Sequence, residues 1–172
     1  MVILSVGPRS TSETEIDHFE RMKDIRMAEI IRQAGAVWKG NLRGGKGIIS
    51  TESTVLAEVP YSFATRFENE PGTNPEELIA AAHSACYAMA FASTLAKKGY
   101  EPQSIDVHAA CVLEKRDGGF AITRMRLRAR GVVPDIDDDT FYQVAKEADK
   151  SCPVSNLLRP GLIIELETDL LS

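Results

Sequence analysis

The sequence predicts an α+β protein in which antiparallel sheets surround one long buried helix. Residues 75–98 are apolar for most of their length and begin with strong helix-start signals. On both sides of this segment, short stretches of alternating apolar and polar residues are separated by glycine-rich turns. Alternation with a period of two is typical of half-buried strands, and an apolar surface on all sides is typical of a buried helix.

Composition restricts the class of protein further. A chain of 172 residues with 44% hydrophobic and 26% charged residues is of the size and composition of one globular domain. The net charge of -5 gives no bias towards nucleic acid or an anionic membrane. No run of 18 apolar residues occurs, so we expect no membrane span. The first residues lack the basic segment of a secretory signal, and we therefore expect a cytoplasmic, reducing location.

Residues 1–34 are interpreted as an N-terminal arm that precedes a single domain of residues 35–172. Ser12 can cap a helix whose apolar positions continue at a loose helical spacing to Ile31, with charged residues on its other face. We expect a docking element without a chemical role.

Three short strands are predicted next, at residues 36–38, 48–56 and 61–67. The glycine-rich residues 43–47 between the first two lack the spacing of a phosphate-binding loop, so they are interpreted as a hairpin turn.

The helix of residues 75–98 has the clearest boundaries. Asn74 is predicted as its N-cap, with Pro75 at the first helical position and Glu77 placed for a capping box, and Gly99 is predicted as its C-cap. A helix of this length extends for about 35 Å. One sheet of the same chain cannot cover all its sides, so we expect a partner chain to cover the rest.

The C-terminal part is predicted to contain a strand at 105–113, an antiparallel strand at 120–130, a helix at 137–150, a short helix that ends at Leu158 and a strand at 162–170. Four arginines alternate along the second of these strands, at positions 124, 126, 128 and 130. No aromatic residues lie between them and the chain is acidic, so we interpret them as a solvated sheet face and not as a nucleic-acid site.

The cysteines are the candidates for chemistry. Cys86 lies inside the apolar helix and, taken alone, is better explained as a small core residue than as a reactive thiol. Cys111 is in phase with core residues of a strand. Cys152 precedes Pro153 at a helix start, where a thiolate is stabilised, which on this ground alone makes it the low-pKa thiol. His83, one turn before Cys86, could act as a base or as a packing residue.

Beyond these patterns, residues 35–171 resemble the OsmC/Ohr family of hydroperoxide reductases, and its OsmC branch in particular. The matching segments are collinear over about four-fifths of the chain. They are residues 36–40 (AVWKG), 45–47 (GKG), 50–53 (STES), 60–63 (PYSF), 65–68 (TRFE), 72–78 (GTNPEEL), 81–86 (AAHSAC), 118–123 (GGFAIT) and 152–155 (CPVS).

The resemblance implies that Cys86 is the peroxidatic cysteine, that Cys152 resolves its oxidised form, and that Glu76 and Arg66 hold and activate the thiolate. In the Ohr branch the arginine lies earlier, near Arg43. The implied protein is a thiol peroxidase that reduces organic hydroperoxides through a sulfenic acid and an intramolecular disulfide. It uses no metal or cofactor, is reduced by an external dithiol such as a lipoyl-type donor, and forms an intertwined homodimer.

Two other functions stay open at this stage. A thiol hydrolase or acyltransferase could use Cys86 with His83, and a non-enzymatic stress or binding protein would keep its cysteines inert. If the central helix is unbroken, the ten positions between Glu76 and Cys86 separate their backbones by about 15 Å. We therefore predict that Glu76 approaches the Cys86 of a second chain across a two-fold axis.

Overall fold

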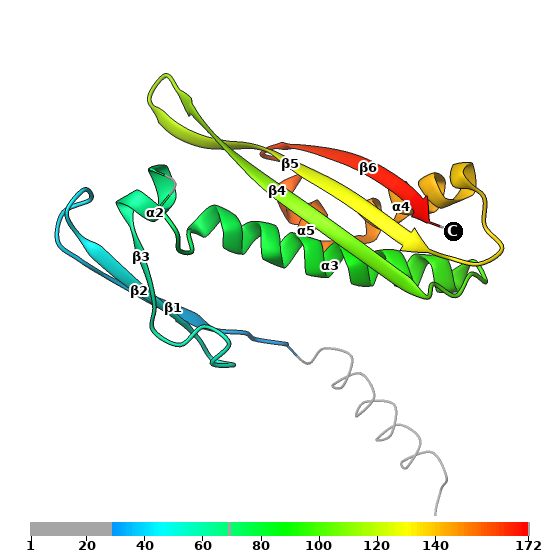
Figure 1. Cartoon of the computed structure of the whole chain (residues 1–172), viewed down its shortest axis with the longest axis horizontal. Coiled ribbons are helices and arrows are strands. Elements are labelled where there is room, and N and C mark those ends of the chain that lie inside the picture. The colour runs from blue at the N-terminus through cyan, green and yellow to red at the C-terminus, as the bar shows by residue number, and fades with distance from the viewer. Residues whose placement is uncertain (1–28, 69, 172) are drawn as a thin grey trace, which may run out of the picture.

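The computed structural model describes residues 29–68 and 70–171, arranged as two three-stranded sheets with a long helix between them in the chain (Figure 1). Most of the helix predicted from Ser12 lies outside these residues. Its predicted end is wrong, because residues 29–33 have no regular secondary structure. The elements, in chain order, are β1 (Ala34–Lys39), β2 (Lys46–Thr51), β3 (Val59–Ser62), α2 (Phe63–Phe67), α3 (Pro75–Lys97), β4 (Ser104–Arg116), β5 (Gly119–Val132), α4 (Asp138–Ser151), α5 (Pro153–Leu158) and β6 (Ile163–Leu171).

The second sheet is mixed, whereas the sequence predicted antiparallel sheets. β4 and β5 form an antiparallel hairpin, but β6 pairs with β5 in parallel, from Arg124 opposite Ile163 to Val132 opposite Leu171. The alternation of residues 162–170 identifies a strand but carries no information on its direction. The direction follows from the connection, because α4 and α5 form the long crossover that a parallel pair requires.

The third predicted strand is also shorter than expected. β3 ends at Ser62, and the next five residues form α2. Ser62 Oγ accepts the Thr65 amide at 3.1 Å, and Thr65 Oγ1 accepts the Ser62 amide at 3.0 Å. This reciprocal capping box overrides the strand propensity of the aromatic and β-branched residues that follow.

The predicted strand of residues 48–56 likewise stops early, at Thr51. The Leu56 amide donates to Thr51 Oγ1 at 3.1 Å, and the Thr51 amide donates to the Leu56 carbonyl at 2.9 Å. These two bonds close a turn where the pattern predicted an extended strand.

α3 is continuous from Pro75 to Lys97, as predicted. Asn74 Oδ1 accepts the Glu77 amide at 2.9 Å, which confirms the N-cap. The predicted C-cap is wrong by one residue, because Lys98 occupies it. Gly99 follows with a φ of +87°, a backbone conformation that glycine adopts at no steric cost.

One face of α3 builds the core. Tyr87, Phe91 and Leu95 are fully buried against β5 and α4, where Phe91 and Phe141 pack with ring centroids 4.9 Å apart. α3 and α4 also contact each other, and they lie along the second sheet (Figure 1). The first sheet lies near the start of α3, apart from this core.

The other face of α3 is open in the single chain. Ala81, Ala82 and Ala85 are exposed, and Met89 is 75% exposed. By length and composition alone, α3 could cross a membrane. The absence of an uninterrupted run of 18 apolar residues had predicted no such helix. Its buried aromatic face nevertheless belongs to the core of the domain.

The arginine-rich face of β5 is solvated, and its charges are paired with acidic residues of the neighbouring strands. Arg124 and Arg126 contact Glu165, Arg128 contacts Asp169, and Arg130 contacts Asp106. The alternate residues Met125, Leu127 and Ala129 are buried, as predicted. Neutralised arginines of this kind do not form a nucleic-acid patch.

Candidate active site

Two free cysteines meet between the middle of α3 and the start of α5. The sulfurs of Cys86 and Cys152 are 3.4 Å apart, although 66 positions separate them in the sequence. Cys152 is fully buried, whereas Cys86 is only partly buried. A disulfide bond is about 2.05 Å long, so a small movement would join the two sulfurs.

The local sequence explains where Cys152 sits. It is at once the C-cap of α4 and the N-cap of α5, and Pro153 begins the new helix. Its amide donates to the Ala148 carbonyl at 2.9 Å and its carbonyl accepts the Asn156 amide at 3.0 Å. The side chain makes no capping bond of its own, so its sulfur is free to face α3.

Burial raises the pKa of the Cys86 thiol above its usual value, and the neighbouring Cys152 adds to this effect. A backbone hydrogen bond from Val154 acts in the opposite direction, because it stabilises the thiolate. Within one chain the net result is a protonated thiol at neutral pH, and a protonated thiol is a poor nucleophile.

Arg66 and Glu76 form a second functional cluster, where α2 meets the first turn of α3. Arg66 Nε donates to Glu76 Oε2 at 3.1 Å and Arg66 Nη2 donates to Glu76 Oε1 at 2.7 Å. Glu76 is buried, and the Arg66 guanidinium also lies 5.0 Å from the centroid of the Phe67 ring. Such a bidentate pair fixes the orientation of the guanidinium.

Arg43, the other candidate arginine, is placed differently. Its guanidinium stacks 5.2 Å from the centroid of the Phe63 ring and makes no ion pair with Glu76. Among the described residues, Arg66 is thus the arginine that Glu76 holds.

The two clusters do not meet in a single chain. α3 is unbroken, and Glu76 in its first turn is ten positions before Cys86. A rise of 1.5 Å per residue separates their backbones by about 15 Å.

Comparisons with known proteins agree with this arrangement of elements. The model of the family described as OsmC-like protein matches residues 67–167. The chain belongs to this family. It is 46% identical to Peroxiredoxin OsmC of Escherichia coli (strain K12) over 138 residues, which are 80% of this chain and 96% of the relative.

Solved structures of OsmC-family proteins have the same fold. The crystal structure of the organic hydroperoxide resistance protein OhrB of Bacillus subtilis matches with a TM-score of 0.64 at 25% identity, covering 80% of this chain and 98% of that chain. An organic hydroperoxide resistance protein of Elizabethkingia anophelis matches with a TM-score of 0.67 at 22% identity, over 84% of this chain and 100% of that chain. At this identity the match shows a shared fold and no more.

His83 of this OsmC-family chain is not presented to Cys86 as a base. It is fully buried, and its Nε2 lies 2.8 Å from Ser155 Oγ. Burial lowers the pKa of the imidazole, so the ring is neutral at pH 7. The sequence did not predict the contact with Ser155, nor the one between Val154 and Cys86.

Cys111 is half-buried on β4, in agreement with a position in phase with core residues. Burial raises the pKa of its thiol, and the negative charge of Glu76 raises it further. The charge of Glu76 therefore acts on Cys111, which the strand pattern alone could not show.

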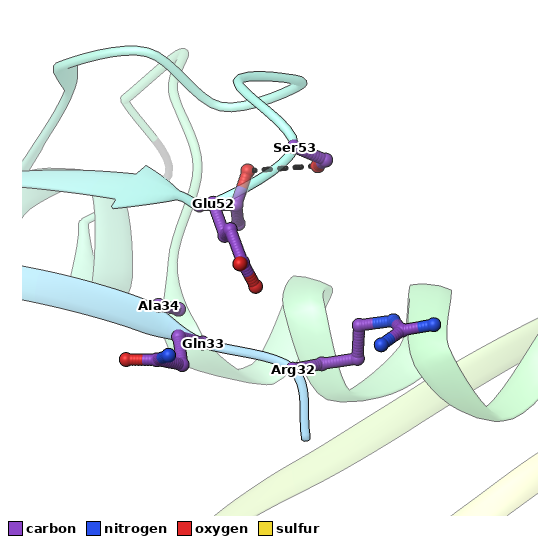
Figure 2. Close-up of a pocket in the computed structure, with 6 residues that line it drawn as sticks. Arg32, Gln33, Ala34, Glu52 and Ser53 are labelled. Atoms are coloured by element: carbon purple, nitrogen blue, oxygen red, sulfur yellow. Dashed lines mark hydrogen bonds between the residues drawn. The ribbon is translucent and has the colours of Figure 1, made fainter. Parts of the chain in front are cut away.

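Hollows elsewhere on the OsmC-family fold hold neither cluster. Figure 2 shows one of about 510 Å³ beside β1, lined by Arg32, Gln33, Ala34, Thr51, Glu52 and Ser53. A second, apolar hollow of about 300 Å³ lies between the first sheet and the start of α3, lined by residues that include Tyr61 and Leu78. Within residues 29–68 and 70–171, no group of three or more His, Cys, Asp or Glu residues is placed to hold a metal ion.

Proposed function

We infer that this chain is a thiol-dependent peroxidase that reduces organic hydroperoxides to alcohols, with Cys86 as the attacking cysteine and Cys152 as the resolving one. The observation that carries this proposal is the pair of free thiols whose sulfurs are 3.4 Å apart. The 46% identity to a protein named peroxiredoxin, and the likeness to proteins of organic hydroperoxide resistance, support it.

Access to solvent supports Cys86 as the attacking cysteine. Cys152 has no exposed surface, so a hydroperoxide cannot reach its sulfur without displacing α5. Cys86 is partly exposed on α3. The helix-start argument favoured Cys152 as the reactive thiol, but reactivity requires contact with the substrate as well as a low pKa.

In the first step the Cys86 thiolate attacks the terminal oxygen of the hydroperoxide. The O–O bond breaks, an S–O bond forms, and the departing alkoxide takes a proton and leaves as the alcohol. The sulfur loses two electrons and becomes a sulfenic acid, while the peroxide is reduced.

In the second step the Cys152 sulfur attacks the sulfenic sulfur of Cys86. A disulfide forms, and the hydroxyl leaves as water after taking the thiol proton. An external dithiol then returns both cysteines to thiols by exchange and is itself oxidised to a disulfide. A lipoyl-type donor has the required chemistry.

Activation of Cys86 is assigned to the Arg66–Glu76 pair of a second copy of the chain. Within one chain the pKa of Cys86 is raised, and Glu76, which holds the Arg66 guanidinium, is about 15 Å from Cys86 along the backbone of α3. A guanidinium beside the sulfur would stabilise the thiolate and the leaving alkoxide, and the carboxylate of Glu76 would hold it in place.

A homodimer would also cover the apolar surface that the single chain leaves open. The exposed side of α3 contains Ala81, Ala85 and Met89, and the first sheet exposes Val37 and Ile48. An isologous interface with α3 at its centre buries both faces and brings each Glu76 towards the other chain's site.

The remaining parts of the proposal concern the arm and the compartment. The match to the family model begins at residue 67, and the sequence motifs that resemble the family begin at residue 36. We therefore place the domain at residues 35–172 and assign no part of the chemistry to the arm of residues 1–34. The cytoplasm is the proposed location, because it supplies dithiols and keeps unpaired cysteines reduced.

A peroxide titration with intact-mass analysis tests the function. One equivalent of an alkyl hydroperoxide should yield one equivalent of alcohol and a chain lighter by about 2 Da, and digestion should place the disulfide between the two cysteines. A folded chain whose mass and Cys86 alkylation stay unchanged after excess hydroperoxide would contradict the proposal. Ester hydrolysis without peroxide consumption would instead support the thiol hydrolase.

A further inference from the structure

We propose that His83 and Ser155 form a positioning pair that holds the first turn of α5 against α3, so that Cys152 faces Cys86. This inference rests on the proposed function, since it concerns the step in which the two cysteines join. The observation behind it is the hydrogen bond of 2.8 Å between two fully buried side chains.

The hydrogen bond lies next to the two sulfurs because His83 and Ser155 are each three positions from one of the cysteines. His83 lies three positions before Cys86 on α3, and Ser155 lies three positions after Cys152. Residues three apart on a helix share one face, so His83 and Cys86 point from α3 towards the same segment. That segment presents Cys152 and Ser155 to α3 within four residues, where they contact Cys86 and His83 respectively.

Burial makes this hydrogen bond a firm constraint. Because burial lowers the pKa of His83, the ring is neutral and carries one proton. His83 Nδ1 has no hydrogen-bond partner among the described residues. If the single proton of the ring lies on Nε2, then Nε2 donates to Ser155 Oγ, and the unpaired Nδ1 is an acceptor instead of a donor. If α5 moved away from α3, the buried polar groups of His83 and Ser155 would lose their hydrogen-bond partners, which costs free energy.

A second buried bond joins α3 to α4 instead of to α5. The Tyr87 hydroxyl donates to the Ala145 carbonyl at 2.8 Å and ties α3 to α4, the helix that ends just before Cys152. α5 itself has only six residues. Within residues 29–68 and 70–171, the His83–Ser155 bond is the side-chain hydrogen bond that joins α5 to α3, whereas Asn156 Nδ2 and Arg159 Nη2 join the α5 segment to the end of α4.

The function of the pair would be visible in the fate of the sulfenic acid. Cys86 sulfenic acid either condenses with Cys152 and releases water, or reacts with a second hydroperoxide to give sulfinic acid and a second alcohol. Only the first reaction needs α5 in position. A loose α5 should consequently shift the outcome towards sulfinic acid, with little effect on the first oxidation.

The experiment compares Ser155→Ala and His83→Leu with His83→Gln, which keeps a nitrogen donor near the position of Nε2. Each full-length variant is treated with increasing cumene hydroperoxide, and intact mass gives the ratio of disulfide to sulfinic acid. We expect the first two variants to over-oxidise at least about tenfold more readily, and His83→Gln to recover most of the wild-type ratio. The rate of first oxidation, measured at alkaline pH where Cys86 is a thiolate in all variants, should change less than about threefold.

Tyr87→Phe is the matched control, since it removes a bond of the same length and burial that reaches α4 instead of α5. Cooperative thermal unfolding shows which variants are folded, and the Gln and Leu variants at position 83 provide the comparison if Ser155→Ala does not fold. An unchanged ratio in the folded variants, or an equal shift in Tyr87→Phe, overturns the positioning role and leaves the peroxidase proposal intact. Absence of any Cys86–Cys152 disulfide in the unmodified protein would instead overturn both.

Discussion

The proposed sharing of one active site between two chains leads to a subunit-mixing experiment in which two inactive variants restore activity. Cys86→Ser removes the attacking sulfur and Glu76→Ala removes the carboxylate that holds Arg66. Ten residues of unbroken helix separate the two positions, about 15 Å, which is more than the two side chains span together. If each site combines Cys86 of one chain with Glu76 of the other, one intact site should form in every mixed dimer.

The expected recovery follows from random pairing of the chains. Half of the dimers in an equal mixture are mixed, and one of their two sites is intact, so about one quarter of wild-type activity should return. The assay is hydroperoxide consumption in the presence of a dithiol, and native mass spectrometry verifies subunit exchange.

A mixture of Cys86→Ser with Cys152→Ser is the matched control for this experiment. These two cysteines contact each other within one chain, so no disulfide-forming site should return. Complete absence of recovered activity in the Cys86→Ser and Glu76→Ala mixture, after verified exchange, would refute the reasoning and place both residues in the same chain's site.

Three other outcomes are expected. Cys152→Ser should keep the fast first oxidation but accumulate sulfenic and then sulfinic acid at Cys86, and a loss of the first step would mean that the two roles are reversed. Met89→Asp should place a charge on the open side of α3 and give monomers in analytical ultracentrifugation. Because the pKa of the Cys86 thiol is raised in the single chain, the pH midpoint of Cys86 alkylation should also move upward in this variant. A variant that stays dimeric would argue against α3 as the interface. Deletion of residues 1–30 should change kcat by only a few-fold, and a hundredfold loss in a folded truncation would show that the arm shapes the site.

The parts of the fold that sequence predicted well are those set by local signals. α3 is the best example, because Asn74, Pro75 and Gly99 mark its ends and no residue between them breaks the helix. The alternation of β5 also predicted the buried and solvated faces correctly, since side-chain direction in a strand has a period of two regardless of its partners.

The parts that sequence predicted poorly depend on contacts that the pattern does not contain. The parallel pairing of β6 is decided by the crossover through α4 and α5. The capping box of Ser62 and Thr65 is local and could have been found, but a run of aromatic and β-branched residues was interpreted as a strand.

The candidate site shows the same division. The proximity of Cys86 and Cys152 came from the resemblance to known hydroperoxide reductases, because no local rule joins residues so far apart. The contact of His83 with Ser155 was missed entirely. One signal was available: each residue lies three positions from a suspected cysteine, which is the helical spacing for a shared face.

The raised pKa of Cys86 makes physical sense if the site is completed only on assembly. In a lone chain the Cys86 sulfur is a thiol next to the buried Cys152 thiol, and the Arg66–Glu76 pair lies at the start of α3. A thiol reacts with peroxides far more slowly than a thiolate, so under the proposed function an unassembled chain would resist over-oxidation. In the proposed dimer, pairing brings Arg66 to the partner's sulfur in the same event that covers the open side of α3. Stability of the interface and reactivity of the cysteine would then be linked, because both depend on α3 of one chain meeting the first turn of α3 of the other.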